Sequence, residues 1–437
     1  MEETKKKNPL KILLATVIVL SALFLALTFK EQHTLRIGIF YGSNWEVPGT
    51  MHYDIIDQAI EKYKKEHPGI RVVYEEGIPS EDYSEWLFGE ILKGTEPDLY
   101  LILEEDFQTL AAGGMLKPLD TFLAADDEAE DSAFYPMSIA AGQYQKKQYA
   151  LPFSCNPTLM FVNKTLLKKE GIALPDNYWT WEEFYTICRQ TVRDTDGDGK
   201  LDQFGCYGYT WDQAVYANGI RLFNEEGTES AVTDDRFLEA MEFVRSLEET
   251  NQGYQVSADD FDLGHVVFRP LTFSDYRTYM PYPWRIKKYS DFEWNCMPMP
   301  AGPSGTNTSS METLLFGMSA RTHKEKEAWD FLKLLTMDEE IQKLIYKDSS
   351  GASPLKAVTR SDEVMEFLNE DTPGGRDIDL SLLDQAIANA AAPENFRLHQ
   401  EVYDKMDSVL SVLTKSRDDI RTALFNLTRE LDEMLRQ

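Results

Sequence analysis

Residues 98–103, with the sequence DLYLIL, form a short apolar run of the kind that becomes a buried strand. Two similar runs precede it in the chain, TLRIGIFY at 34–41 and IRVVY at 70–74. Between these runs, apolar residues recur at helical spacing over 51–65 and 83–92. Strand and helix patterns that alternate in this way predict an α/β fold, in which crossover helices join the strands of a parallel sheet.

Polar side chains and one tryptophan follow the carboxyl ends of two predicted strands. Those after the first strand are Asn44, Trp45 and Glu46, and those after the third are Glu104, Glu105 and Asp106. Ligands of open parallel sheets bind at this edge of the sheet. These residues are therefore the first candidates for a binding site.

A long extended run, YALPFSCNPTLMFV, occupies residues 149–162. It contains Pro152 and Pro157, and proline is uncommon in central strands because it lacks the backbone N–H. The run is therefore predicted to cross between two parts of the protein, or to form an edge strand, rather than to be a central strand. Further helices are predicted at 107–112, 181–192, 236–249, 324–335 and 338–346, and in the segment 377–435.

The composition is that of a large globular protein. The chain has 437 residues, 43% of them hydrophobic, and its 44 Lys and Arg against 74 Asp and Glu give a net charge of −30. This acidity argues against nucleic acid and against an anionic membrane surface as partners, because both need a basic face. Four cysteines are too few for a disulfide scaffold. Cys188 and Cys206 could form one disulfide, and isolated buried thiols are the alternative.

The N-terminus predicts export. An apolar run at 12–29 would span about 27 Å as a helix, close to the hydrocarbon thickness of a bilayer. The lysines that precede it are Lys5, Lys6, Lys7 and Lys11. They predict that the N-terminus stays inside and that the body of the protein lies outside the cytoplasmic membrane. We expect residues 1–30 to be a Lys-rich cytoplasmic end and a transmembrane anchor for an extracellular body, with a cleaved signal peptide as the alternative.

Residues 194–202 resemble the first nine positions of a calcium-binding loop. The candidate metal ligands are Asp194, Asp196, Asp198 and Asp202, at positions 1, 3, 5 and 9. Position 12, which should be a bidentate Glu, is Gly205, so the strongest anionic ligand is missing. Weak structural Ca²⁺ binding and a plain acidic turn both remain open, and no cofactor is required.

No motif for catalysis stands out. The chain contains no G-x-S-x-G, no H-E-x-x-H and no Gly-rich phosphate loop. Glu104 and Glu105 could serve as the acid and base of a glycosidase, but adjacent carboxylates are unavoidable among 74 acidic residues. Loop aromatics such as Trp45, Trp211 and Trp284 instead suit a sugar site, where rings stack on a pyranose and nearby polar groups bind its hydroxyls.

Several segments occur in a characteristic order along the chain. They are KQYALPF at 147–153, LMFVNK at 159–164, WTWEEF at 179–184, the acidic loop at 194–205, FEWNCMPMP at 292–300, GMS at 317–319 and AWDFLK at 328–333. Together they resemble the extracellular solute-binding proteins (family 1) of bacterial ABC transporters, chiefly sugar and oligosaccharide binders. The resemblance implies a two-lobed periplasmic-binding-protein-like α/β fold with a hinge and a cleft, preceded by the predicted transmembrane helix. Lobe 1 would comprise 34–153 and 297–336, and lobe 2 would comprise 154–296 and 337–437.

The resemblance also implies where a ligand binds. The cleft would be lined from lobe 1 by Asn44, Trp45, Glu46, Glu104 and Asp106, from the crossing segment by Ser154 and Asn156, and from lobe 2 by Trp211, Asp212, Trp284, Arg285, Asn395 and Phe396. The family's lipid-carrying cysteine is absent, since no Cys precedes Cys155, which favours the helix as the anchor.

The function that the resemblance implies is transport. It predicts a monomeric, non-enzymatic component of an importer that binds a mono- or oligosaccharide and delivers it to the ABC permease in the membrane. An exported carbohydrate-active enzyme with a carboxylate pair is one alternative. A ligand sensor for a membrane kinase is another.

Overall fold

The computed structural model describes residues 33–42, 53–224, 226–279, 292–370 and 380–436. Within these residues, no helix is both long enough and apolar enough to cross a membrane. The predicted N-terminal anchor lies outside them, as do five residues of the predicted cleft: Asn44, Trp45, Glu46, Trp284 and Arg285. These assignments stay predictions.

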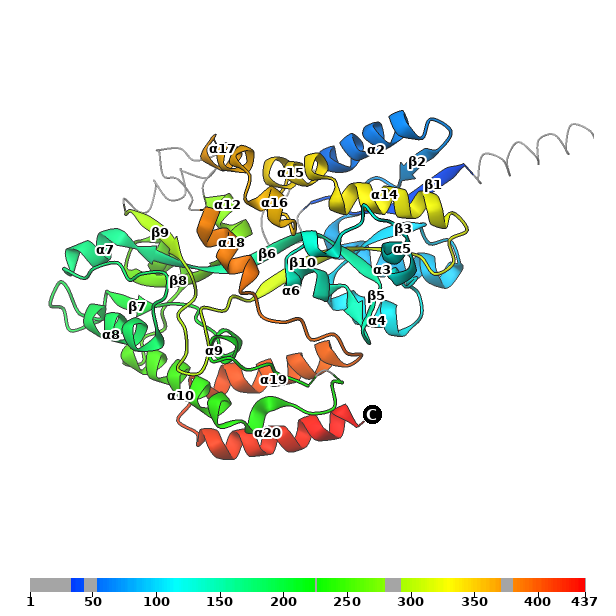
Figure 1. Ribbon diagram of the computed structural model, residues 1–437. Helices are drawn as coiled ribbons and strands as arrows, with labels where there is room; N and C mark the ends of the chain where they lie inside the picture. The colour runs from blue at the N-terminus through cyan, green and yellow to red at the C-terminus, as the bar shows by residue number, and fades with distance from the viewer. Residues whose placement is uncertain (1–32, 43–52, 225, 280–291, 371–379, 437) are drawn as a thin grey trace, which may run out of the picture.

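An eight-stranded sheet runs through the protein (Figure 1). Its strands are β1 (Thr34–Gly38), β2 (Arg71–Tyr74), β3 (Leu99–Ile102), β6 (Ala150–Asn163), β7 (Phe204–Cys206), β8 (Val266–Thr272), β9 (Trp294–Met297) and β10 (Met311–Met318). Their order is β2-β1-β3-β10-β6-β8-β7, and β9 also pairs with β6. Strand β1 is parallel to both β2 and β3. The helices α2 (Asp54–Glu66) and α3 (Ser80–Lys93) lie between these strands in the chain, so the predicted parallel sheet with crossover helices is confirmed.

Strand β6 joins the two halves of the sheet. Its first part pairs antiparallel with β10, from Ala150 to Pro157. Its second part pairs antiparallel with β8 from Thr158 to Val162, and with β9 from Met160 to Asn163. The predicted crossing is therefore confirmed, but the expectation that this segment is not a central strand is wrong.

The two prolines of β6 are tolerated because of where they fall in the ladder. The register between β6 and β10 shifts between Leu314 and Leu315, beside the position opposite Pro152. Pro157 lies opposite Met311 at the first residue of β10, where β6 changes partners. A missing N–H is accommodated at such irregular positions.

The buried side chains form a core for each lobe of a two-lobed α/β fold. The first cluster packs β1–β3 and β10 against α2, α3, α4 (Glu104–Ala112), α14 (Glu325–Met337) and α15 (Glu339–Asp348). On β6, Met160 and Val162 join a second cluster, whereas Leu159 and Phe161 join a third. Because side chains alternate along a strand, the second lobe has an apolar core on each face of its sheet. The exact lobe boundaries stay a prediction.

The second cluster lies under α8 (Trp181–Thr191), α9 (Trp211–Ala217), α10 (Asp235–Thr250), α19 (His399–Leu413) and α20 (Ile420–Leu435). The third includes residues of α11 (Ala258–Asp262), α12 (Phe273–Tyr279), α16 (Lys356–Thr359), α17 (Asp362–Glu370) and α18 (Leu380–Ala388). The remaining elements are α5 (Asp120–Ala125), η1 (Asp131–Ala133), α6 (Pro136–Ala141), β4 (Gln143–Tyr144), β5 (Lys147–Gln148), α7 (Lys164–Lys169) and η2 (Ala231–Thr233).

The predicted helices are present, with ends shifted by a few residues. The segment 377–435 contains α18, α19 and α20. All four cysteines are free thiols, including Cys188 and Cys206. The structure therefore has isolated thiols, and Cys188 and Cys206 do not form a disulfide in it.

Candidate functional site

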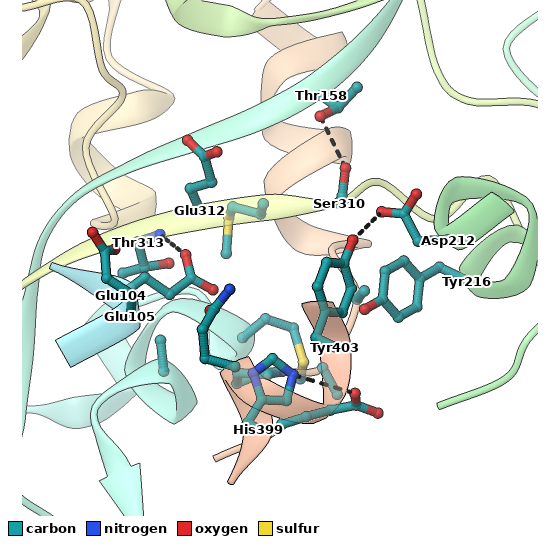
Figure 2. Close-up of a pocket in the computed structure, with 18 of the residues that line it drawn as sticks. Glu104, Glu105, Thr158, Asp212, Tyr216, Ser310, Glu312, Thr313, His399 and Tyr403 are labelled. Carbon is teal, nitrogen blue, oxygen red and sulfur yellow. Dashed lines mark hydrogen bonds and ion pairs between the residues drawn. The ribbon is translucent and has the colours of Figure 1, made fainter. Parts of the chain in front are cut away.

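A cavity of about 680 Å³ lies between the elements of the two lobes. Its first wall comes from α4, α6 and the beginning of β10, with Glu104, Gln108 and Glu312. Its second wall comes from α9, α19 and the segment before α19, with Asp212, Tyr216 and Tyr403 among its residues. Figure 2 shows Glu104 and Glu312 on one side of the open space, and Asp212, Tyr216 and Tyr403 on the other.

The first wall begins where β3 ends. Glu104 and Glu105 form the first turn of α4 and line the cavity, whereas Asp106 accepts a hydrogen bond of 2.5 Å from the hydroxyl of Ser84 and is buried elsewhere. Successive residues of a helix point about 100° apart, which separates Asp106 from its neighbours. The predicted binding edge at the carboxyl end of this strand is thus polar, but only part of the acidic triplet faces the cavity.

Glu104 has a strongly perturbed carboxyl group. Its side chain is exposed to the solvent in the cavity, although many protein atoms surround the carboxyl group. It accepts a hydrogen bond of 3.3 Å from the backbone N–H of Thr313. Loss of hydration and the nearby charge of Glu312 raise the pKa of Glu104 to about 8, against the lowering effect of that N–H. The hydrogen bond of 3.3 Å from Asn156 Nδ2 reaches the carboxylate of Glu312.

The second wall combines a carboxylate with aromatic rings. Thr210 is the N-cap of α9, and its backbone N–H donates to the side chain of Gln213 in a capping box. This start of the helix places Asp212 and Tyr216, one turn apart, in the cavity wall. The Tyr403 hydroxyl donates a hydrogen bond of 3.3 Å to Asp212. Burial raises the pKa of Asp212, while hydrogen bonds to it act in the opposite direction.

Glu394 and His399 form the buried end of the second wall. Glu394 is only 7% exposed, and its Oε1 accepts a hydrogen bond of 3.0 Å from the backbone N–H of Phe223. Its Oε2 has no hydrogen-bond partner and lies 3.8 Å from His399 Nε2. Burial raises the pKa of Glu394 to about 7, against the lowering effect of the Arg221 charge, and burial lowers the pKa of His399 to about 4, against the raising effect of Asp404. Near neutral pH, His399 is therefore neutral and does not neutralise Glu394.

The other predicted site residues in the described part of the chain lie outside the cavity wall. Ser154 is buried in β6 beside β10. Asn156 is also buried, and it ties β6 to Ser274 and Glu312. Trp211 packs in the second cluster, with its indole N–H bonded to Asp407 at 2.8 Å.

Asn395 and Phe396, the further predicted contacts, also lie outside the cavity wall. Asn395 Oδ1 accepts a hydrogen bond of 3.0 Å from the side-chain amide of Gln108, a residue of the cavity wall. Asn395 therefore helps to hold Gln108 in place. Phe396 packs edge-on against Phe223 in the core of the second lobe. Of the predicted residues that the structure describes, Glu104 and Asp212 are the two that line the cavity.

Several wall residues were not predicted. Thr158, Ser310 and Glu312 come from the junction of β6 and β10, which a sequence does not locate without the pairing. His399 and Tyr403 had a detectable signal, whereas Tyr216 on α9 did not. His399 and Tyr403 are four residues apart on α19, off the stripe of buried Val402, Met406 and Leu410. Aromatic side chains beside an apolar stripe, rather than in it, mark a second contact surface.

The acidic loop lies away from this cavity. Carboxylate oxygens of Asp194, Asp196 and Asp202 lie within 4.8 Å of one another, and Asp198 is not part of that group. Asp194 accepts hydrogen bonds from the backbone N–H groups of Gly197 and Gly199, at 2.6 and 2.8 Å. These contacts fit an acidic turn, and they use oxygens that a cation would need.

Comparisons with known proteins agree with this architecture. A sequence profile for the bacterial extracellular solute-binding protein family matches residues 50–342. The maltotriose-binding protein of Pyrococcus abyssi is 22% identical over 71% of this chain and 65% of its own length, which is less than two thirds of that relative.

Solved structures share the fold over nearly the whole chain. The sugar-binding protein MalE of Xanthomonas citri has a TM-score of 0.75 at 15% identity, over 92% of this chain and 97% of its own. The cyclic α-maltosyl-1,6-maltose binding protein of Arthrobacter globiformis has a TM-score of 0.75 at 16% identity, over 92% and 98%. With the profile match over most of the chain, the protein belongs to the bacterial extracellular solute-binding protein family.

Proposed function

We propose that this protein is the carbohydrate-binding component of an ABC importer, and that the cavity between its lobes holds a mono- or oligosaccharide. The observation that carries the proposal is the composition of the cavity wall. Carboxylates, the amide of Gln108 and the hydroxyls of Thr158 and Ser310 can bind sugar hydroxyls, while Tyr216 and Tyr403 bring aromatic rings to the wall, against which a pyranose can pack. Family membership and the sugar ligands named for its relatives support the same class of ligand.

The proposed mechanism is closure of the two lobes around the ligand. Because Glu104 and Tyr403 lie on opposite walls, a saccharide that contacts both would stabilise the closed form over the open one. The permease would then recognise the closed monomer. An N-terminal helix would hold the chain at the outer face of the membrane, with the predicted Trp45 and Trp284 as further contacts.

The test is a binding screen with the full chain in detergent. Maltotriose, mannotriose and other mono- and oligosaccharides are expected to raise the melting temperature, because they bind the native state. Calorimetry then gives the affinity. Y403A and Y216A each remove a ring from the wall, and we expect a loss of about tenfold or more. Y178A is the matched control, since Tyr178 is 77% exposed and outside the wall.

The same samples separate binding from catalysis. If the chain is a binding protein, the saccharide that stabilises it is recovered intact after prolonged incubation. Shortened products would instead support a glycosidase that uses the cavity carboxylates. Absence of binding to every saccharide, or equal binding by Y403A, Y216A and the wild type, would contradict the proposal.

A further inference from the structure

The described wall of the cavity has one sign of charge. Carboxylates enter it from both lobes: Glu104, Glu105, Asp212, Glu312 and Glu394. Among the wall residues that the structure describes there is no Lys or Arg, and His399 is kept neutral near pH 7 by burial. A neutral saccharide does not require so many carboxyl groups, because amides and hydroxyls can also bind its hydroxyl groups.

Glu394 provides an independent sign that a hydrogen-bond donor is missing from the wall. Its side chain is almost completely buried, and although the charge of Arg221 acts on it, its Oε2 lacks a hydrogen-bond partner in the protein. A buried carboxylate oxygen without a donor is unfavourable unless a partner arrives. His399, at 3.8 Å, is too far for a hydrogen bond.

The arrangement suits an organic cation better than a metal ion. In the described part of the chain, the group of carboxylates close enough to share one ion is in the acidic loop, not in the cavity. The cavity carboxylates are distributed over α4, β10, α9 and the segment before α19. A ligand several ångströms long can meet such separated charges, and Tyr216 and Tyr403 can pack against either a sugar ring or an ammonium group.

We propose that the solute is a saccharide with a protonated amino group, held between the carboxylates of the two walls. This proposal rests on the proposed function and makes its ligand class more specific. Glu104 and Glu312 bind the ammonium group from the first lobe, and Asp212 and Glu394 contribute negative charge from the second. The tyrosines pack on the sugar ring.

The test compares matched saccharides that differ in charge. Oligosaccharides of glucosamine and galactosamine are titrated into the full chain beside their N-acetylated forms, which have the same rings and linkages but no charge. Oligogalacturonides provide the anionic class, maltotriose and mannotriose the neutral class, and spermidine the amine without a sugar. We expect at least one free-amine saccharide to bind about tenfold or more tightly than its N-acetylated form, with an affinity that falls as salt is raised.

Proton exchange gives a second readout with a definite sign. At a pH of about 6.5 the ligand amine is already protonated. Loss of hydration and the charge of Glu312 keep Glu104 protonated in the free protein, and burial keeps much of Glu394 protonated despite the charge of Arg221. A bound cation lowers the pKa of both carboxyls, so protons are released. Calorimetry in buffers of different ionisation enthalpy measures this release. A neutral sugar that only displaces water would cause no release or a small uptake.

Variants of the cavity carboxylates test whether these residues bind the amino group. E104Q and E312Q keep the size of the side chain and remove its charge, and we expect each to reduce binding of the amine form about tenfold while E104Q also reduces proton release. E242Q is the matched control, because Glu242 is an exposed residue of α10 outside the wall. If E104Q and E312Q bind the amine form as tightly as E242Q and the wild type do, the proposal is contradicted.

The outcomes separate this inference from the proposed function. If maltotriose, mannotriose, an N-acetylated form or an oligogalacturonide binds and no amine form binds more tightly, the inference is wrong and the sugar-binding function stands. If no saccharide binds at all, both fail. Binding of spermidine without any saccharide would also overturn the proposal, because the ligand would then be an amine that is not a sugar.

Discussion

The acidic loop and the cavity contain the same kind of side chain in opposite environments. In the loop, Asp194 accepts two backbone N–H groups and Asp202 accepts the N–H and the hydroxyl of Thr195. These hydrogen bonds lower the pKa of both aspartates. In the cavity, Glu104 receives one long hydrogen bond and Glu394 has an oxygen without a partner. Loss of hydration raises the pKa of both glutamates, and the charge of Glu312 adds to the shift of Glu104.

The difference shows that the number of carboxylates is a poor guide to a site. The loop brings its own donors inward, because Gly197 and Gly199 adopt positive φ angles of 78° and 89° that suit glycine. Its negative charge is therefore stabilised without a ligand. In the cavity, Glu104 and Glu394 are short of donors, so a ligand can supply what the protein does not. The candidate site is where the carboxyl groups are least stabilised.

E394Q should have the largest effect on the ligand-free protein. A carboxyl whose folded pKa is raised from 4.5 to about 7 binds more protons in the folded state. Its contribution to stability is therefore lost as the pH rises from about 4.5 through 7. Gln keeps an acceptor for the N–H of Phe223 and carries no charge. We expect E394Q to be more stable than the wild type at pH 8, by on the order of 2 kcal/mol more than at pH 5.

Urea unfolding at the two pH values measures this difference. Below about pH 6.5, the protonation of His399 lowers the stability of the folded protein, which opposes the effect of Glu394. The free energy of unfolding is therefore compared between E394Q and the wild type at each pH, not between pH values of one protein. H399Q is the control, and it should remove the loss of stability at low pH that comes from burying a base with a pKa of about 4. If E394Q were less stable than the wild type at pH 8, the unpartnered oxygen would have a stabilising role that contradicts this account.

Sequence patterns predicted the first lobe well, because its strands and crossover helices are local. The run at 98–103 becomes β3, and the polar residues after it do reach the cavity through Glu104. The site of the second lobe was harder. The family resemblance implies aromatic contacts at Trp211 and Phe396, but these rings pack in the core, while Tyr216 and Tyr403 line the cavity. Composition does not distinguish a ring in the core from a ring in the wall, since both are next to apolar residues.

The contribution of β6 was missed for a different physical reason. Its prolines argue against a central strand when hydrogen bonding is considered residue by residue. The register shift beside Pro152 and the change of partner after Pro157 arise from pairing with β10 and β8, which lie more than a hundred residues further along the chain. Thr158 and Ser310 enter the cavity wall at that junction, so this part of the site depends on long-range contacts.

E104Q should have a smaller effect than E394Q, although the pKa of Glu104 is raised further. The Glu104 side chain faces the solvent-filled cavity, and screening reduces the free energy that follows from the shift. We expect E104Q to stabilise the ligand-free protein by about 1 kcal/mol at pH 8 and by less at pH 5, since the wild-type carboxyl is protonated there. Urea unfolding checks it, with E105Q as the matched neighbour on α4. An effect as large as that of E394Q would mean that the cavity excludes water.

D194N should have the smallest effect and the opposite sign. The folded pKa of Asp194 is lowered, so its contribution to stability is present above the unfolded pKa and is lost as the pH falls through the folded value. We expect a decrease in melting temperature of less than about 2 °C at pH 7, because the loop is exposed. The decrease should disappear at low pH, where the wild-type carboxyl is protonated. E104Q is the contrasting control, since its effect grows with pH.

Addition of Ca²⁺ is a second test of whether the acidic loop, like the cavity, needs a cation. The loop oxygens already accept N–H groups and position 12 is Gly205, so we expect 1 mM Ca²⁺ to raise the melting temperature by no more than about 2 °C. Any rise should be lost in D194N and kept in E104Q. A rise above about 5 °C that D194N abolishes would show that the ion replaces the backbone donors, and the loop would then resemble the cavity in needing a cation.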